Sequence, residues 1–167
     1  MSKKDIEATI KKVLADFTSN TIRNDPAGSG TFGASRAGGT RVHKGKDYEV
    51  AEGDAINSPV LGKVTKIGYP YGDDLSYRYI QVTDMDGNDH RMFYVSPDKQ
   101  LKVGDTVKQG DKVGTAQDVA KKHGGEMKTH VHYEILDPAK KPIDEDEYRK
   151  RRVASTSAGR QGKGEQP

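Results

Sequence analysis

The sequence predicts a mainly β domain, and three observations lead to this prediction. Short runs rich in β-branched and aromatic residues recur through the centre of the chain, and turn-forming clusters such as DMDGND at 84–89 separate them. A length of 167 residues suits one domain with a single core. Apolar and charged residues each make up 32% of the chain, low and high respectively for a compact domain, so we expect the two ends to lie outside the fold.

The elements can be assigned in chain order. Residues 1–20 carry apolar side chains at helical spacing and predict an amphipathic helix, and the turn-forming residues of 21–30 predict a linker. Residues 31–148 form the predicted domain, with one short helix expected within 118–127. Residues 149–167 are predicted to be a disordered basic tail because they are almost devoid of apolar side chains. The expected strands are 47–50, 62–69, 77–84, 90–96, 111–117 and 130–136.

The apolar stripe of the N-terminal helix has two interpretations. It consists of Ile6, Ile10, Val13, Leu14 and Phe17. The helix could fold back on its own domain, or the stripe could be an assembly surface that contacts another subunit or a larger particle such as a phage virion or tail. The sequence leaves both interpretations open, with assembly slightly favoured.

Composition and charge exclude several function classes. The chain has no cysteine, so a zinc ion would be held by nitrogen and oxygen, and disulfides are excluded. The net charge of +3 equals the surplus of cations from Arg151 to residue 167, so the rest of the sequence is about neutral and no nucleic-acid binding is expected. No apolar run is long enough for a signal peptide or a membrane span, so we expect synthesis in a host cytoplasm and no membrane insertion.

Two histidine motifs, HKGKD at 43–47 and HVH at 130–132, predict a metal site. Residues i and i+2 of a strand point to the same face, so His130 and His132 can reach one point. His43 and Asp47 flank a Lys-Gly-Lys turn in which Gly45 would allow both side chains to face a common centre. Two imidazoles and one carboxylate, with water in the fourth position, are typical of a catalytic zinc site and leave one histidine as a base.

The order of motifs resembles the lysostaphin/LytM-type zinc metalloendopeptidases, which cleave peptide cross-links in bacterial peptidoglycan. The resemblance covers roughly residues 28–144. It rests on the HxxxD pair, SPVLGKV at 58–64, a Gly-Asp-x-Val-x-x-Gly turn at 104–110, and the HxH strand with its following acidic residue and Asp-Pro. It implies an antiparallel β-sandwich or half-barrel of the lysostaphin/LytM peptidase type, with an N-terminal helix and a disordered C-terminal tail added here.

The resemblance also implies roles for individual residues. His43, Asp47 and His132 would hold zinc, and His130 would be catalytic. The family usually has a further catalytic histidine in a Tyr-x-His pattern, and the corresponding segment, FYVSP, has Ser96 at that place. Serine cannot accept a proton near neutral pH, which predicts slow catalysis.

Other side chains could support the site. His90 lies on the same face as Ser96 if the strand is regular, and Tyr94 offers a hydroxyl donor. Glu134 could orient the imidazole of His132. His123 is expected to cap the short helix or to face solvent as a cation.

Two functions therefore compete. The first is a zinc-dependent peptidoglycan endopeptidase acting at the cell wall or periplasm, delivered by a phage lysis system or as part of a virion. The second is a zinc-stabilised module of the same fold that binds peptide or glycan without cleaving it; the family contains non-peptidase members that lack the second catalytic histidine. A biotinyl or lipoyl carrier domain, with Lys128 as the modified residue, shares the turn pattern but leaves the four motif residues unexplained.

Overall fold

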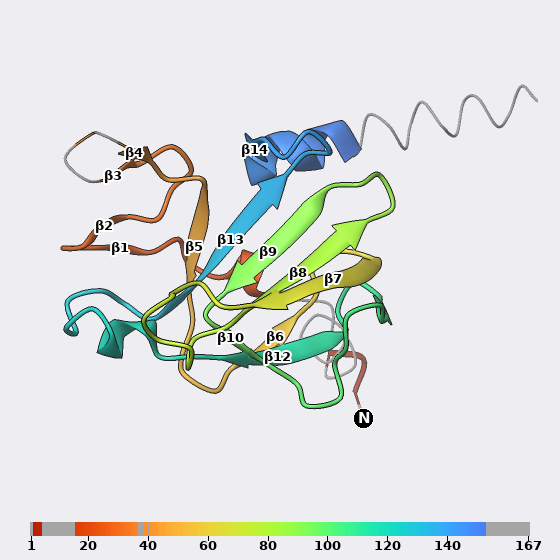
Figure 1. Ribbon diagram of the computed structural model, residues 1–167, viewed down its shortest axis with the longest axis horizontal. Coiled ribbons are helices and arrows are strands. Elements are labelled where there is room, and N and C mark those ends of the chain that lie inside the picture. The colour runs from red at the N-terminus through yellow and green to blue at the C-terminus, as the bar shows by residue number, and fades with distance from the viewer. Residues whose placement is uncertain (1, 5–15, 37–38, 40, 153–167) are drawn as a thin grey trace, which may run out of the picture.

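The computed structural model describes residues 2–4, 16–36, 39 and 41–152 (Figure 1). Residues 3 and 4 are helical; the described part further contains the 3-10 turns η1 (Phe17–Ser19) and η3 (Val119–Lys121) and ends with a helix over 145–152. The strands are β1 (Asn24–Asp25), β2 (Gly28–Ser29), β3 (Ser35–Arg36), β4 (Arg41–Val42), β5 (Gly45–Glu49), β6 (Ala55–Asn57), β7 (Gly62–Gly68), β8 (Tyr79–Asp84), β9 (Asp89–Phe93), β10 (Val95–Pro97), β11 (Thr106–Val107), β12 (Lys112–Ala116), β13 (His130–Leu136) and β14 (Pro142–Ile143).

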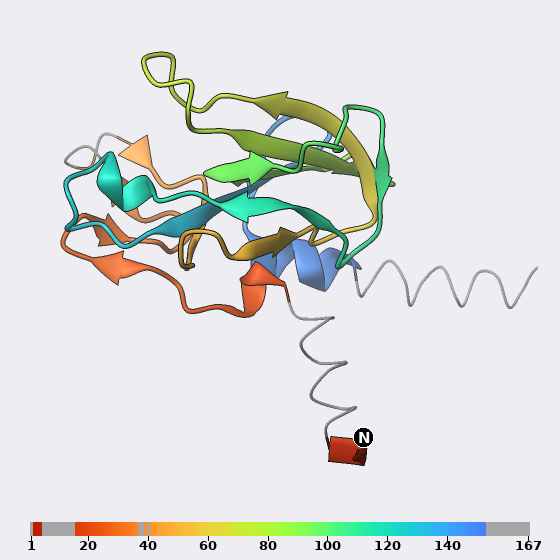
Figure 2. The same ribbon diagram turned by 90° about the horizontal axis from the view of Figure 1, so that it is seen from below.

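The strands form a large curved sheet with a small sheet beneath it (Figure 2). The large sheet has the order β11-β7-β8-β9-β13-β14, and β5 pairs with β13. The small sheet has the order β10-β12-β6, and β1-β2 and β3-β4 are separate hairpins. Every strand pairing is antiparallel, which confirms the predicted mainly β, antiparallel fold.

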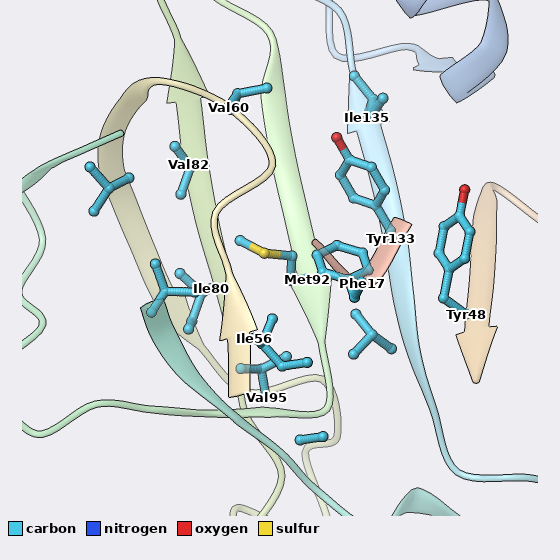
Figure 3. Packing of buried hydrophobic residues seen from close by; sticks show 14 of the residues in the cluster. Phe17, Tyr48, Ile56, Val60, Ile80, Val82, Met92, Val95, Tyr133 and Ile135 are labelled. Carbon is cyan, nitrogen blue, oxygen red and sulfur yellow. The ribbon is translucent and has the colours of Figure 1, made fainter. Parts of the chain in front are cut away.

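The core lies between the two sheets and continues beneath β5 and β13 (Figure 3). Alternate residues of each strand enter it, as period-2 side-chain placement requires. The inner face of the large sheet contributes Val64, Ile80, Val82, Met92, Val131, Tyr133 and Ile135, and the small sheet contributes Ile56, Val95, Val113 and Ala116. Phe17 packs edge-on against Tyr48 and Tyr133, which anchors the N-terminal segment on this core.

Strand β13 fixes the position of the two HxH histidines. Because Val131, Tyr133 and Ile135 face the core, His130, His132 and Glu134 must face the opposite side of the sheet. Asp47 of β5 pairs directly with His132, so its side chain lies on that same face. The strand register therefore brings an aspartate and a histidine together from segments 85 residues apart.

Residues 21–30 are not a linker, contrary to our prediction. Ile22 forms a bridge with Tyr48, strands β1 and β2 form a hairpin, and Arg23 is only 2% exposed. Their polar and turn-forming composition reflects a hairpin held by buried ion pairs rather than an open connection. The part of the predicted N-terminal helix that carries Ile6, Ile10, Val13 and Leu14 lies outside the described residues, so an assembly surface there stays a prediction.

Two further boundaries differ from those predicted. Phe17, assigned to the helical stripe, belongs to the 3-10 turn η1 and to the core of its own domain. The helix over 145–152 continues past the expected end of the domain at 148, because Tyr148 is buried and Arg149 bonds to Glu145 and Thr18. Residues 153–167 lie outside the described part. Within the described residues, no helix is both long and apolar enough to cross a bilayer.

Candidate metal centre and groove

Three potential ligand atoms converge above β5 and β13. His43 Nε2 lies 3.0 Å from Asp47 Oδ1 and 2.9 Å from His132 Nδ1, and His132 Nδ1 lies 2.7 Å from Asp47 Oδ1. Ligands at about 2.0–2.1 Å from one tetrahedral zinc ion lie about 3.3 Å apart, so the observed spacing is close to that of a shared ion. The three side chains are largely buried, with His132 the most exposed at 13%. Two nitrogens and one carboxylate oxygen therefore offer three ligands of a zinc site.

Hydrogen bonds outside this centre fix which nitrogen of each imidazole faces it. His43 Nδ1 lies 2.8 Å from the carbonyl oxygen of Thr31, so Nδ1 carries the proton and Nε2 keeps its lone pair. His132 Nε2 lies 2.8 Å from Glu134 Oε1, so Nδ1 is the nitrogen that would face a metal; without one, burial is outweighed by the hydrogen bonds to Asp47 and Glu134, which raise the pKa of His132 to about 9. Glu134 thus lies where we predicted it, beside the imidazole that it would orient.

Arg23 also belongs to the site, which the sequence did not predict. Its Nε and Nη2 donate to Asp47 Oδ2 at 3.1 and 3.0 Å, and its Nη1 donates to Asp25 Oδ1 at 2.7 Å. This fork occupies one oxygen of Asp47 and leaves Oδ1 for the centre. Burial favours the protonated form of Asp47, but hydrogen bonds with His132 and His43, together with the charge of His132, outweigh it and hold the pKa of Asp47 far below its usual range. Asp47 is consequently an anion at neutral pH.

Two glycines allow the chain to approach the centre closely. An added Cβ at Gly45 would lie 2.2 Å from the backbone oxygen of Tyr133, and one at Gly30 would lie 2.8 Å from the Asp47 Cβ. We predicted that Gly45 belongs to a flexible turn, which is wrong: it is the first residue of β5 and pairs with Glu134. Its role is to remove a side chain where two strands touch.

His130 lies beside the three ligand atoms without joining them. Its Nδ1 bonds to the carbonyl oxygen of Lys128 at 2.7 Å, and its Nε2 lies 3.8 Å from Asp47 Oδ2. Burial lowers the pKa of His130 and outweighs the attraction of Asp47. His130 is therefore neutral at physiological pH and presents Nε2 to the space above the centre.

That space is an open groove of about 910 Å³. Cationic side chains, among them Arg36, Arg41 and Lys44, line this groove, and so do Tyr71, Tyr94 and His123. His123 is exposed, as predicted, but it is not a free cation: its Nε2 lies 2.9 Å from the Tyr71 hydroxyl at the groove, and partial burial lowers its pKa. Tyr71 was not predicted; an aromatic residue in a loop rich in Gly, Pro and Asp was the available signal.

Tyr94, rather than Ser96, faces His130. The rings of Tyr94 and His130 meet edge to face with centroids 5.4 Å apart. Ser96 lies on β10 opposite Thr115 and lines a separate cavity with Tyr77 and Gln117. Ser96 therefore does not face the candidate centre, and Tyr94 is the residue of this segment that lies next to His130.

His90 does not support the site, contrary to the interpretation that it could replace a catalytic group. It is fully buried on the core side of β9, with Nδ1 2.6 Å from the Tyr133 hydroxyl and Nε2 2.9 Å from Asp84 Oδ2. Tyr94 has a φ of 69°, which breaks the strand after Phe93 and resets the alternation of faces. The shared parity of His90 and Ser96 consequently has no structural meaning.

Comparisons with known proteins identify relatives of this chain. The model of Peptidase family M23 matches residues 41–145. A curated protein of Haemophilus influenzae described as an uncharacterized metalloprotease is 32% identical over 99 residues, which are 59% of this chain and 19% of that protein. The chain thus spans about a fifth of the length of this relative.

Solved structures share the fold. The catalytic domain of the antimicrobial peptidase lysostaphin from Staphylococcus simulans superposes with a TM-score of 0.57 at 21% identity, over 80% of this chain and 95% of that one. A variant of the catalytic domain of the prophage-encoded M23 protein EnpA from Enterococcus faecalis gives a TM-score of 0.53 at 22% identity, over 75% and 88%. A zinc-containing peptidase from Vibrio cholerae gives 0.51 at 21% identity, over 73% and 35%.

Proposed function

The chain belongs to Peptidase family M23, and on that premise we propose that it is a zinc-dependent endopeptidase that cleaves the peptide cross-links of bacterial peptidoglycan. The observation that carries the proposal is the convergence of His43 Nε2, Asp47 Oδ1 and His132 Nδ1 beneath an open groove, with His130 beside them. A purely structural zinc site normally has four protein ligands. Three ligands under a groove favour a catalytic site.

Zinc fits these residues on the chemistry of the donor set. Thr31 and Glu134 accept from the outer nitrogens of the two imidazoles, so the inner nitrogens are the ones that would give their lone pairs to a metal, and Asp47 presents one anionic oxygen. When bound, zinc supplies a Lewis acid that polarises a carbonyl and lowers the pKa of its water to about 7.

The residues around the ligands have separable tasks. Arg23 holds Asp47 in one orientation, and Glu134 accepts a hydrogen bond from the Nε2–H of His132. His130, neutral with its Nδ1 proton bonded to the Lys128 carbonyl oxygen, presents the Nε2 lone pair to the groove, so it is placed to take a proton from the attacking water and to pass it to the leaving amine. The cationic side chains of Arg36, Arg41 and Lys44, which line the groove, suit a peptide that carries free carboxylates.

One observation favours the second candidate function, a zinc-stabilised module that binds peptide or glycan with weak or no cleavage. Burial raises the pKa of Tyr94, so the residue facing His130 stays a protonated phenol. A phenol of this kind donates a hydrogen bond but does not accept a proton near neutral pH. The site therefore has one group, His130, that exchanges protons readily.

The test is release of new amino groups from purified sacculi, with zinc, with a chelator, and with zinc restored after chelation. We expect slow release that the chelator abolishes and zinc restores. Asp47→Asn should abolish release, and Glu49→Gln is the matched control, because Glu49 lies two residues further along β5 and pairs with Lys128 outside the groove. Sedimentation of the zinc-loaded protein with sacculi, without amine release, would instead support the binding module.

A further inference from the structure

Three side chains that line the groove, those of His123, Tyr71 and Tyr94, form a hydrogen-bonded row that ends beside His130. His123 Nε2 lies 2.9 Å from the Tyr71 hydroxyl, which donates to the Tyr94 hydroxyl at 3.3 Å. The three residues come from different segments: Tyr71 from the loop between β7 and β8, Tyr94 from the break between β9 and β10, and His123 from the residues after η3. The row ends where the Tyr94 ring meets His130.

The number of available protons determines which atom is the donor in each hydrogen bond of the row. A tyrosine has one hydroxyl proton, and that of Tyr71 is used toward Tyr94. The contact between His123 and Tyr71 therefore needs a proton on His123 Nε2, so His123 is the donor there. Within the described part of the chain, Tyr71 is the recorded hydrogen-bond partner of the Tyr94 hydroxyl, so the proton of Tyr94 is left for an acceptor in the groove.

We infer that His123, acting through Tyr71, positions the Tyr94 hydroxyl as a hydrogen-bond donor to the oxyanion that develops during peptide cleavage. The inference rests on the proposed function and assigns its oxyanion donor. Each hydroxyl in the row donates onward, and such chains polarise one another, which strengthens the last donor. Tyr94 is then the catalytic residue of the row, and Tyr71 and His123 are positioning residues.

Packing holds the row in place. The rings of Tyr71 and Tyr94 stack with an interplanar angle of 17°. Tyr77 packs edge-on against Tyr71 from the other side, and Lys122 Nζ lies 4.4 Å from the centre of the Tyr71 ring. A donor fixed before the substrate arrives needs little reorganisation during the reaction, and this is the property that makes oxyanion donors effective.

Kinetics on sacculi or a cross-linked peptide test the inference. Tyr94→Phe should lower kcat/KM by about 100-fold, the usual cost of one oxyanion donor. Tyr71→Phe and His123→Ala should each lower it by about 10-fold, because they act only through Tyr94. His123→Gln keeps an N–H donor and should recover most of the rate lost in His123→Ala. The double variant Tyr71→Phe/Tyr94→Phe should be no slower than Tyr94→Phe alone.

The matched control is Tyr69→Phe. It removes a tyrosine hydroxyl just after β7, from a side chain that is 49% exposed, packs on Arg78 and does not line the groove. We expect its activity to be unchanged. Zinc content must stay the same in every variant, which separates loss of the donor from loss of the metal.

A readout independent of activity is the tautomer of His123 in the zinc-loaded protein. The nitrogen-15 shifts of its imidazole, at a pH above its titration, should show a proton on Nε2, and Tyr71→Phe should change them. A proton on Nδ1 alone would reverse the direction of the row and overturn the inference, whether or not the wild type cleaves sacculi. An unchanged rate for Tyr94→Phe, or equal losses for His123→Ala and His123→Gln, would overturn it as well. A wild type without chelator-sensitive cleavage overturns the proposed function instead.

Discussion

Replacing Arg23 by alanine removes the cation that holds Asp47. The guanidinium is 2% exposed and makes hydrogen bonds to both Asp47 and Asp25, whose side chains are 3% and 1% exposed. Without it, two buried carboxylates lose their shared partner. Breaking one buried ion pair by removing one member costs about 3–5 kcal/mol, so we expect a loss of at least this size in the free energy of unfolding of the zinc-free protein.

The assay is urea unfolding of the zinc-free protein, followed by zinc titration of the folded fraction. Arg36→Ala is the matched control: it removes the same charge near the same Asp47 oxygen, but at 3.6 Å and from a side chain that is 22% exposed, so we expect about 1 kcal/mol or less. Zinc affinity should fall about 10- to 100-fold in Arg23→Ala, as for other residues that orient a ligand.

The loss of stability caused by Arg23→Ala should become smaller as the pH falls. Burial favours the protonated forms of Asp25 and Asp47, but their hydrogen bonds outweigh it and lower both pKa values. Stability gained this way is present above the unfolded pKa of about 3.9 and is lost as the pH falls through the folded values. The difference between wild type and Arg23→Ala should therefore shrink below about pH 4. Equal losses for Arg23→Ala and Arg36→Ala at pH 7 would refute the reasoning.

Three more predictions concern other contacts. Glu134→Gln should lower zinc affinity about 10-fold by titration calorimetry, because the acceptor for His132 Nε2–H loses its charge; an unchanged affinity would mean that Glu134 is a solvated strand charge. Asp84→Asn should lower the free energy of unfolding in urea by about 2–3 kcal/mol at pH 7, because hydrogen bonds from buried partners outweigh burial and lower the pKa of Asp84. This loss should diminish below about pH 4, and a loss that does not depend on pH would contradict the explanation. Gly45→Ala should destabilise the fold by several kcal/mol, at least about 2, while Gly72→Ala, which meets no atom within 4 Å, should be neutral in the same melts; equal effects would argue against the close strand contact.

The fold and the three ligand residues could be predicted because they depend on local pattern. Alternation along β13 places His130 and His132 on one face whatever the rest of the chain does, and the turn signals separate the strands correctly. The same rule failed for Ser96 and His90. It assumes an unbroken strand, and the positive φ of Tyr94 ends that strand at Phe93.

Arg23 and the His123 row could not be predicted, for a different reason. Arg23 meets Asp47 because Ile22 pairs with Tyr48, a contact across 26 residues that leaves no local pattern. His123 follows a short 3-10 turn whose direction depends on the hydrogen bond between Asp118 and Thr129, so its spacing from Tyr71 in the sequence carries no information. For residues 21–30 the composition led to the wrong prediction of a linker, because buried ion pairs and turns use the same residue types as linkers.

Metal stoichiometry of the purified protein, measured by elemental analysis at neutral pH without chelator, tests the central claim most directly. The account predicts one zinc per chain in the wild type and in Glu49→Gln, and none in Asp47→Asn or His132→Ala that remain folded by circular dichroism. Wild-type protein without zinc, or Asp47→Asn that retains a full equivalent, would contradict the claim that His43, Asp47 and His132 form a zinc site.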